Sequence, residues 1–368
     1  MALRMIQVGT GGMGTTWCRD FLPPHVAAGR IEVVAAVDTN PEVLANARVH
    51  LGLAEAQCYT DIQRAFDENP ADFCTVVVPP YSHEEVVDQA VAHDLHILSE
   101  KPIADTLVAS VRIADKVTKA GKKMAVTMSH RFNQYKTTMR ESVRSGRYGD
   151  LNYLVFRFTQ EARNTGSWGF GFRYEMEDPL LVEGSVHHLD ILADLAGAKC
   201  DTIYARTWNP AWSEFAGDAQ ALVTMDFENG VRATYEGSKV NAVGLDGWGR
   251  ENTRAECEGA TLVLGSDRLE CFPFDPTRQA RIKAEGDGHT VPWLEQPFWG
   301  HVWLIEKFVH WLEGGEPMET NVIDNLQSVA LVTAAIESSK TGLPVKVQEH
   351  LAAAWGEVGA SQGRSIWT

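Results

Sequence analysis

A glycine-rich run near the N-terminus restricts the fold of this chain more than any other feature. Gly9-Thr10-Gly11-Gly12-Met13-Gly14 has the G-x-G-x-x-G pattern, and it lies between the β-prone segment Arg4–Val8 and the helix-like segment Thr15–Phe21. In this setting the first glycine permits a tight turn, the second lets the backbone approach a pyrophosphate, and the third lets helix and strand pack closely. The run therefore predicts a βα turn that binds a dinucleotide. An ordinary glycine-rich turn is the alternative, because a chain with 31 glycines contains such patterns by chance.

The spacing of apolar residues divides the chain into two regions. Up to about residue 128, short β-branched runs alternate with stretches of helical spacing such as Ser82–His93 and Thr106–Ala120, which is typical of a parallel sheet wound by helices. From about Ser129 onward, strand-like runs follow one another with only turns between several of them, which predicts a mostly antiparallel sheet. These later runs are Leu151–Thr159, Thr202–Trp208, Gln220–Phe227, Gly230–Gly237 and Thr253–Leu264.

We therefore expect an α/β chain with two domains. A Rossmann domain is expected over residues 1–128, and an α+β domain with a large, mostly antiparallel open sheet over residues 129–368. Two long helices, Phe298–Glu313 and Val322–Thr341, are expected to close the second domain. From Ala352 onward the periodicity is weak, so we expect an arm or a frayed end there.

Charge and cysteine usage narrow the range of partners. Lys and Arg total 33 against 49 Asp and Glu, a net charge of −16 that repels the phosphate backbone and anionic lipid surfaces, so we expect neither nucleic acid nor membrane partners. Because Leu3–Val8 runs directly into glycines and no apolar stretch is long enough to span a bilayer, we expect neither an export signal nor a transmembrane segment. The six cysteines form no C-x-x-C pair and no Cys/His cluster at metal-ligand spacing, so we expect free thiols in the cytoplasm and no bound metal.

Asp38, at the end of the second β-prone run, bears on the choice of dinucleotide. A carboxylate at this position accepts hydrogen bonds from both ribose hydroxyls and repels the extra phosphate of NADP. The following Thr39 and Asn40 provide no arginine for that phosphate. The prediction is NAD rather than NADP. Alternatively, Asp38 is a surface residue that caps a helix over Pro41–Val49.

Two further segments end strands of the predicted parallel sheet. They are Val78-Pro79-Pro80-Tyr81-Ser82-His83 and, after the next strand, Glu100-Lys101-Pro102. Ligands collect at the carboxyl ends of such strands, so both segments are expected beside the glycine-rich run. Lys101 is thus placed for chemistry, and Pro102 fixes the backbone beside it. A solvated lysine at a strand end is the alternative interpretation.

A third group of polar residues precedes Gly197. If this segment is helical, Glu183, His187 and Asp190 share one face, whereas His188 points about 100° away. An imidazole between two carboxylates suits acid–base chemistry, in which one carboxylate orients the imidazole. A solvated helix face with one histidine in the core explains the same spacing equally well.

Several segments, in the same order along the chain, resemble the family of glucose-fructose oxidoreductase, inositol dehydrogenase and MocA. They are the Gly9–Gly14 run, Val78-Pro79-Pro80 with His83, Glu100-Lys101-Pro102, Arg131-Phe132, Gly184-Ser185-Val186-His187-His188-Leu189-Asp190 and the closing segment Ala335–Val345. The resemblance implies an N-terminal Rossmann domain, a C-terminal domain whose open sheet commonly forms the subunit interface, and tightly bound NAD(H) or NADP(H). A homodimer or homotetramer is therefore expected.

The resemblance also implies roles for individual residues. The catalytic lysine of the family corresponds to Lys101 and its catalytic histidine to His187. Glu183 is the third candidate catalytic residue, and it stands where many polyol-oxidising members have an aspartate. Cofactor contacts are expected from the Gly9–Gly14 run, Asp38, Thr39, Val78, Pro79, Pro80, His83, Glu100 and Lys101. Substrate contacts are expected from Ser129, His130, Arg131, Asn164, His187 and Trp168, the last as an apolar platform for a sugar ring.

These features together lead us to expect an NAD-dependent dehydrogenase that oxidises a secondary hydroxyl of a sugar, glycoside or cyclic polyol. His187 would accept the hydroxyl proton, and Lys101 would hold the oxygen and stabilise its developing negative charge. The two roles exchange if Lys101 loses its proton beside the nicotinamide ring. One alternative is a glycosidase or lyase that oxidises its substrate transiently with bound NAD. The other is a non-catalytic NAD(P)-binding regulator, against which the presence of both Lys101 and His187 argues.

Overall fold

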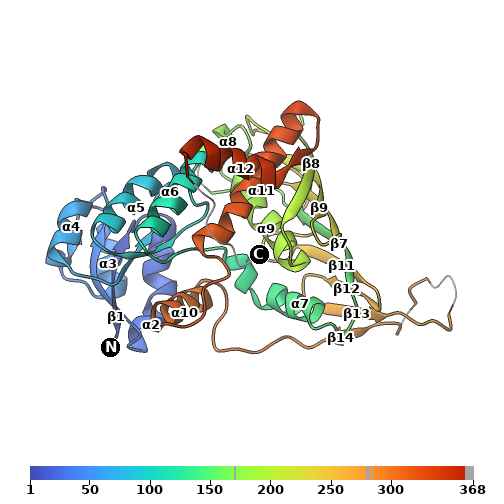
Figure 1. The fold of residues 1–368 in the computed structure, drawn as a ribbon, viewed down its shortest axis with the longest axis horizontal. Helices are drawn as coiled ribbons and strands as arrows, with labels where there is room; N and C mark the ends of the chain where they lie inside the picture. Colours follow the sequence, from blue (N-terminus) through green and yellow to red (C-terminus); the bar gives the residue numbers. More distant parts are fainter. Residues whose placement is uncertain (170, 279–281, 285, 361–368) are drawn as a thin grey trace. The chain divides into compact units, whose positions relative to one another are not determined.

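The computed structural model describes residues 1–169, 171–278, 282–284 and 286–360, and the described chain divides into two compact units. Unit 1 comprises Met1–Phe132, Pro297–Val329 and the described residues from Ala352 onward. Unit 2 comprises Asn133–Gln296 and Ala330–Leu351. Figure 1 shows the fold and labels many of the helices and strands of both units.

Unit 1 is built on a parallel sheet, sheet A, which has six strands in the described chain. They are β1 (Leu3–Val8), β2 (Ile31–Val37), β3 (Cys58–Tyr59), β4 (Phe73–Val76), β5 (His96–Ser99) and β6 (Met124–Val126). Their order across the sheet is β3-β2-β1-β4-β5-β6. The central strands are buried along most of their length, as a parallel sheet wound by helices requires. The strand order reverses between β1 and β4, and ligands bind beside such a reversal. The predicted Rossmann architecture is confirmed.

Helices connect the strands of sheet A (Figure 1). The helical segments of unit 1 are α1 (Met13–Thr16), the π-helix η1 (Trp17–Phe21), α2 (Pro23–Ala27), α3 (Leu44–Leu51), η2 (Glu55–Gln57), α4 (Ile62–Glu68), η3 (Pro80–Ser82), α5 (His83–Ala92), α6 (Leu107–Lys119), η4 (Ser129–Phe132) and α10 (Gly300–Leu312). Side-chain oxygens of Asp61 and Thr106 accept hydrogen bonds from the first turns of α4 and α6, which fixes where these two helices begin.

Helix α10 belongs to the core of unit 1, although it follows β6 only after the whole middle of the chain. Phe308 on α10 is fully buried, and its ring lies 5.5 Å from the ring of Phe73 on β4. Leu304 and Ile305 join the same apolar cluster, which also contains Trp17. Periodicity predicts this helix but not its packing partner, so the first of the two helices expected to close the second domain lies in unit 1.

Unit 2 contains a mixed sheet, sheet B, with nine strands in the described chain. They are β7 (Leu151–Thr159), β8 (Cys200–Trp208), β9 (Gln220–Phe227), β10 (Arg232–Ser238), β11 (Asn252–Cys257), β12 (Ala260–Leu264), β13 (Leu269–Pro273), β14 (His289–Val291) and β15 (Val345–Lys346). The order is β14-β13-β12-β11-β7-β10-β9-β8-β15. Only β7 and β10 pair parallel among these described strands, so the mostly antiparallel prediction is confirmed.

Two parts of sheet B differ from the expectation. The run Thr253–Leu264 is a hairpin of β11 and β12 rather than one strand, because the chain turns at Glu258-Gly259. The turn brings the backbone of Gly259 close to Tyr148, where an added Cβ would lie 3.1 Å from the Tyr148 carbonyl oxygen. The buried positions shift by one residue at this turn, from Thr253 and Ala255 before it to Ala260 and Leu262 after it. Strands β13 and β14 are short, and the sequence did not predict them.

One face of sheet B packs against helices of unit 2. These segments are α7 (Gln134–Arg144), the π-helix η5 (Leu180–Ser185) and α9 (Val186–Ala196), while the short helix α8 (Phe172–Glu175) precedes η5 in the chain. Helix α9 contacts β7 and β10. On β9 the residues alternate, with Val223 buried and Leu222 53% exposed, so the opposite face of the sheet lies open in this chain.

The end of the chain is more regular than expected. After α11 (Val322–Thr341), helix α12 runs over Val347–Val358, so the prediction of an arm or frayed end from Ala352 is wrong as far as Val358. Leu351, Ala354 and Trp355 are buried, and this buried face explains why the segment folds. The rest of the predicted tail lies outside the described residues.

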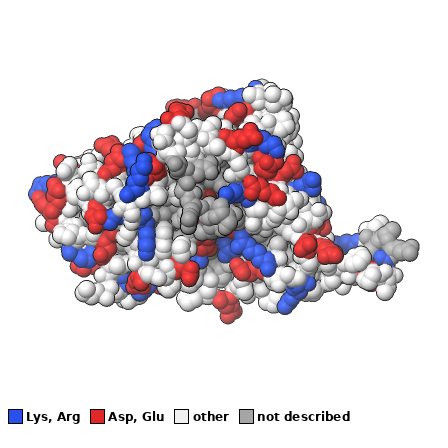
Figure 2. Space-filling model, in the orientation of Figure 1, with Lys and Arg blue, Asp and Glu red and all other residues white. Residues whose placement is uncertain are grey.

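No helix in the described ranges is long and apolar enough to cross a membrane. Figure 2 shows acidic and basic side chains interspersed over the face of the chain that is in view, rather than a continuous basic surface.

Candidate active site

The glycine-rich run forms the turn between β1 and α1. Gly9 has a φ of +88°, and a Cβ there would lie 2.0 Å from the carbonyl oxygen of Val77; a Cβ at Gly14 would lie 2.3 Å from the carbonyl oxygen of Gly9. These two positions need glycine for the fold itself. Gly11 differs, because a Cβ there would meet only Val43, at an ordinary contact distance of 3.5 Å.

The run fits a dinucleotide. The protein leaves room for a side chain at Gly11, so its own packing does not require glycine there, and in this motif the second glycine is the one that lets a ligand approach the backbone. The run is accessible to a ligand at Gly12 and Met13, which are exposed. Thr10, in contrast, is buried. The geometry thus supports the predicted pyrophosphate contacts of this turn.

Asp38 lies at the end of β2 and holds the glycine-rich run. Its Oδ2 accepts hydrogen bonds from the backbone N–H groups of Thr10 (2.8 Å) and Gly11 (3.2 Å), and its Oδ1 accepts one from Asn40 (2.9 Å). Thr39 is exposed beside it. The carboxylate therefore shapes the turn, a role that the sequence did not suggest.

The segment after β4 is braced by His83 rather than left open. The imidazole is fully buried, with Nε2 2.9 Å from the carbonyl oxygen of Val78 and Nδ1 3.1 Å from that of Ile103. Burial lowers the pKa of His83. His83 thus connects the turn that contains Pro79 and Pro80 to the segment after Lys101, and its ring faces backbone carbonyls.

The buried carboxylate of Glu100 makes a hydrogen bond with the backbone of Lys101 in unit 1. Its carboxylate accepts a hydrogen bond from the indole Nε1 of Trp17 (2.8 Å), lies 3.5 Å from Nε2 of His301, and accepts from the backbone N–H of Lys101 (3.3 Å). Burial by itself raises the pKa of Glu100, but the interaction with His301 and the hydrogen bond from Trp17 outweigh it and lower the pKa to about 2. The Lys101–Pro102 peptide bond is cis. Glu100 therefore positions the backbone of Lys101.

The remaining predicted residues of unit 1 follow β6 in η4. Ser129 and His130 are half-buried, and Arg131 is buried, with Nη1 donating to the carbonyl oxygen of Glu319 (3.4 Å). Unit 1 thus carries Lys101, the glycine-rich run and these three residues at the loops that follow strands of sheet A.

In unit 2 the predicted base lies at the start of α9. His187 is 5% exposed, and its ring centroid lies 5.6 Å from that of Trp248 in an edge-to-face arrangement. Glu183 belongs to η5, whose π-helical turn has a different rotation per residue from the α-helix that the spacing argument assumed. Its Oε2 lies 3.1 Å from both Nε and Nη2 of Arg173. Glu183 therefore has a cationic partner that the sequence pattern did not reveal.

His188 lies in a buried polar network. Its Nδ1 is 3.0 Å from the hydroxyl of Tyr235, which is 2.8 Å from the hydroxyl of Ser185, and its Nε2 is 3.4 Å from Oε1 of Glu251. Nζ of Lys136 donates to Oε2 of Glu251 at 2.6 Å. Burial lowers the pKa of His188, against the opposing effect of Glu251. The sequence analysis missed Lys136, Tyr235 and Glu251.

Two predicted substrate residues lie on the loop after β7. Asn164 is exposed, whereas the indole of Trp168 is half-buried beneath two cations, Lys239 and Arg173. Its backbone N–H donates to the hydroxyl of Tyr174 (3.0 Å). The sequence analysis expected Trp168 to be an apolar surface for a sugar ring. In the structure two cationic side chains also lie against its indole.

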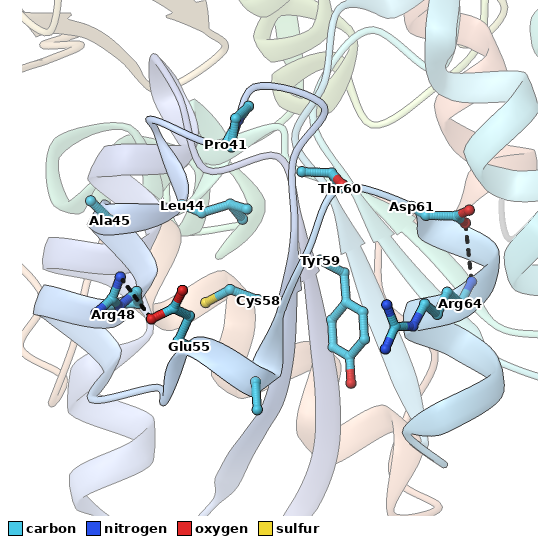
Figure 3. Close-up of a pocket in the computed structure, with 11 residues that line it drawn as sticks. Pro41, Leu44, Ala45, Arg48, Glu55, Cys58, Tyr59, Thr60, Asp61 and Arg64 are labelled. Carbon is cyan, nitrogen blue, oxygen red and sulfur yellow. Dashed lines mark hydrogen bonds and ion pairs between the residues drawn. The ribbon is translucent and has the colours of Figure 1, made fainter.

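Figure 3 shows a surface pocket of about 410 Å³ elsewhere on unit 1. It lies between α3, η2, β3 and α4, with Arg48 and Glu55 on one side and Asp61 and Arg64 on the other. Among the described residues, none of the predicted site residues lines this pocket. The pocket adjoins the β3 edge of sheet A, whereas Lys101 follows β5, which is separated from β3 by three strands.

The chain matches two families of domain. Residues 3–128 match the oxidoreductase family with an NAD-binding Rossmann fold, and residues 137–263 match the C-terminal domain of the same family, GFO/IDH/MocA. An uncharacterized protein of Sinorhizobium fredii, y4oX, is 51% identical over 351 residues, which cover 95% of this chain and 97% of the relative. An inositol 2-dehydrogenase of Pseudarthrobacter chlorophenolicus is 27% identical, with 94% and 96% covered.

A solved structure shares the fold of the whole chain. It is an oxidoreductase from Agrobacterium radiobacter in complex with NAD+, L-tartaric acid and magnesium, with a TM-score of 0.79, 20% identity, and coverage of 95% of this chain and 99% of that one. The two domain matches together span more than half of the chain. The chain therefore belongs to the GFO/IDH/MocA family of oxidoreductases, and its N-terminal domain is an NAD-binding Rossmann domain.

Proposed function

We propose that this protein is an NAD-dependent dehydrogenase that oxidises a secondary hydroxyl of a sugar, glycoside or cyclic polyol, with Lys101 and His187 as catalytic residues. The placement of Lys101 carries the proposal. It follows β5 at the carboxyl edge of sheet A, the edge that also bears the glycine-rich run, and its backbone is tied to the buried Glu100. A rigidly held lysine at a dinucleotide site suits catalysis better than simple binding.

The residues of the chain have distinct roles in the proposed reaction. His187 accepts the proton of the substrate hydroxyl, since a neutral imidazole accepts a proton near neutral pH. The ammonium of Lys101 donates a hydrogen bond to the same oxygen and stabilises the negative charge that develops on it. NAD, when bound, supplies the hydride acceptor. The edge-to-face packing against Trp248 restricts the orientation of the His187 ring.

Asp38 supports NAD over NADP as the preferred cofactor. Its Oδ1 accepts one hydrogen bond, from Asn40, and a carboxylate oxygen has two lone pairs, so it suits a ribose hydroxyl. A negative charge there opposes an additional phosphate. Calorimetric titration with both cofactors tests this preference, and NADP binding as tight as NAD binding would refute it. Asp38→Ala should weaken NAD binding by about 10- to 100-fold, as expected for a hydrogen bond to a charged acceptor.

A substrate screen tests the proposed reaction. Sugars, inositols and glycosides are supplied with NAD, and the absorbance of NADH is followed. The name of the inositol 2-dehydrogenase relative supports this choice of compounds. Steady accumulation of NADH supports a dehydrogenase, whereas conversion of a glycoside without net NADH favours the glycosidase or lyase. The absence of either reaction across the panel overturns the proposal in favour of a regulator.

We also propose that the open face of sheet B is an interface between copies of this chain. Exposed apolar side chains on it, such as Leu222 and Trp208, support the proposal, since large exposed apolar surfaces in such sheets are commonly covered by a partner. Light scattering should give a mass of a dimer or tetramer, and a mass near 40.6 kDa would contradict it.

A further inference from the structure

The imidazole of His301, in the first turn of α10, is part of the polar group around Glu100. Its Nε2 lies 3.5 Å from Oε1 of Glu100, the oxygen that also accepts a hydrogen bond from the indole of Trp17. The other oxygen, Oε2, accepts from the backbone N–H of Lys101 at 3.3 Å. One oxygen of the carboxylate therefore faces two side chains, and the other faces the backbone of the proposed catalytic lysine.

The ring of His301 is held in place by neighbouring rings of unit 1. It stacks on Phe21, with ring centroids 4.2 Å apart and an angle of 6° between the planes, and it meets Trp17 edge-on at 6.0 Å. The first turn of α10 is itself fixed by α2, because Nε2 of the buried His25 lies 2.9 Å from the carbonyl oxygen of Val302. The imidazole is thus restricted to an orientation that faces the carboxylate.

The position of His301 on α10 explains why it points inward. Leu304 and Ile305 lie three and four residues further along the helix, and both are fully buried in the core of unit 1. Residues at these spacings share one face of a helix, so His301 extends the inward face of α10 to its first turn. Its side chain is 15% exposed. A polar residue on this face is placed to contact a polar group inside the unit.

A carboxylate that is as buried as Glu100 depends on its partners for both charge and orientation. The side chain has little contact with water, so protein groups must stabilise its negative charge. Trp17 supplies a neutral donor, whereas an imidazole can also carry a positive charge. The last torsion of a glutamate side chain is soft, so two donors from different elements define the carboxylate plane better than one. The contact of Oε2 with the backbone of Lys101 depends on that plane.

From these contacts we propose that His301 is a positioning residue of the dehydrogenase and acts on Lys101 through Glu100. The inference rests on the function proposed above, in which Lys101 stabilises the negative charge on the substrate oxygen. His301 itself has no chemical step in that reaction. Since α10 packs against η1 and α2, this helix is needed to complete the support of the lysine as well as the core of unit 1.

Variants of His301 separate its N–H donor from its ring. Turnover is measured with NAD and the sugar, inositol or glycoside that reacts fastest in the screen described above. His301→Phe keeps a flat ring on Phe21 and removes the donor, so kcat should fall by about 10- to 100-fold, as for a catalytic group displaced by a fraction of an ångström to about 1 Å. The Kd for NAD, measured by calorimetry, should stay within about threefold, because the glycine-rich run is unchanged.

Two further variants serve as rescue and control. His301→Gln retains an N–H donor on a side chain of similar reach and should recover most of the loss in kcat. His310→Phe makes the same substitution at an exposed histidine of the same helix and should leave kcat unchanged. If His301→Phe does not fold, Phe21→Leu provides the test, because it removes the ring that orients the imidazole and should lower kcat by about threefold or more.

Double variants test the route of the effect. In the Lys101→Met background, His301→Phe should change the residual kcat by less than about twofold, because the group that it positions is already absent. A second cycle combines His301→Phe with Glu100→Gln and follows urea unfolding without NAD or substrate. There we expect the two substitutions to be coupled by at least about threefold in the unfolding equilibrium constant, as for residues in direct contact.

Each outcome has a definite meaning. Equal losses of kcat from His301→Phe with and without Lys101 assign the histidine a purely structural role and overturn the inference. A folded His301→Phe variant with normal kcat, or additive effects in the unfolding cycle, also overturns it, while a strong effect of Lys101→Met keeps the dehydrogenase in place. If Lys101→Met turns over normally, or no compound of the screen yields NADH, the proposed function fails and this inference fails with it.

Discussion

The indole Nε1–H of Trp17 donates a hydrogen bond of 2.8 Å to the carboxylate of Glu100, which lies next to the proposed catalytic Lys101. Trp17→Phe keeps an aromatic ring in the core and removes the donor. We expect it to lower the free energy of unfolding by about 1.5 to 3 kcal/mol, as for a hydrogen bond to a charged group, and to lower kcat. Urea unfolding and steady-state kinetics measure the two effects. Trp212→Phe, at a tryptophan that is 57% exposed, should change the free energy of unfolding by no more than about 0.5 kcal/mol.

The lowered pKa of Glu100 predicts an acid-sensitive contribution to stability. Because its pKa of about 2 in the folded protein lies below the unfolded value of about 4.3, the ionised carboxylate stabilises the fold above the unfolded pKa. This contribution is lost as the pH falls through the folded pKa. Glu100→Gln should therefore lose stability less steeply than the wild type between about pH 5 and pH 3. Urea unfolding at each pH measures the slope, and parallel curves would contradict the prediction.

Gly9 and Gly11 should respond differently to the same substitution. Gly11→Ala meets only Val43 at an ordinary distance, so the melting temperature should change little while NAD binding falls by about tenfold or more because a methyl group occupies the ligand's approach. Gly9→Ala adds a Cβ 2.0 Å from a carbonyl oxygen at a positive φ and should prevent stable folding. Calorimetric NAD titration and thermal unfolding separate the two effects. Unchanged NAD affinity in Gly11→Ala would remove the argument for a ligand at that glycine.

Lys101 and His187 should act on turnover, and His188 on stability. Lys101→Met and His187→Ala are expected to lower kcat by about 10²- to 10⁴-fold with NAD binding largely intact, the range for lost oxyanion stabilisation or proton transfer. His188→Ala creates a cavity and removes a partner from Tyr235, so it should cost about 2 to 4 kcal/mol of unfolding free energy. If folded His188→Ala is inactive while His187→Ala turns over normally, the assignment of the base is reversed.

The ion pair between Lys136 and Glu251 provides a test of buried charge. Both side chains are at least 96% buried, so Glu251→Gln leaves an uncompensated ammonium in the core and should lower the free energy of unfolding by about 3 to 5 kcal/mol. Lys136→Met combined with Glu251→Leu removes both charges and should recover much of that loss. Urea unfolding of the single and double variants gives the comparison. A double variant no more stable than the single one would assign the loss to shape rather than charge.

The sequence predicted those parts of the molecule that depend on local pattern. The β-branched runs predicted the strands of sheet A, and the spacing of Gly9 and Gly14 predicted the turn after the first strand. The structure contains both, because each depends only on contacts within one layer or one turn. Helix α10 was predicted as a helix but not as part of unit 1, because amphipathic spacing reveals an apolar face without identifying its partner. The hairpin at Glu258-Gly259 was missed because the sequence analysis took the two apolar runs as one, although their buried positions shift by one residue, from Thr253 and Ala255 to Ala260 and Leu262.

Much of the polar surrounding of His188 could not be predicted, because its members come from separate elements: α7 carries Lys136, β10 carries Tyr235, and Glu251 precedes β11. These residues have neighbours of ordinary composition, and only tertiary packing brings them together. Lys239 is different. Inward-facing positions of β10 alternate through Ala233, Tyr235 and Gly237, so period two extends the buried face to Lys239. A lysine at a buried position was therefore a signal that the sequence contained.

The return of helix α10 to unit 1 has a consequence for synthesis of the chain. The ring of Phe308 completes the apolar core around Phe73, yet a ribosome makes it long after β6. At about 5 to 20 residues per second, the nascent dinucleotide-binding unit waits some tens of seconds with this part of its core uncovered. A fragment that stops at residue 128 should therefore aggregate or recruit a chaperone, and both units should become protease-resistant only when the last third of the chain has left the ribosome.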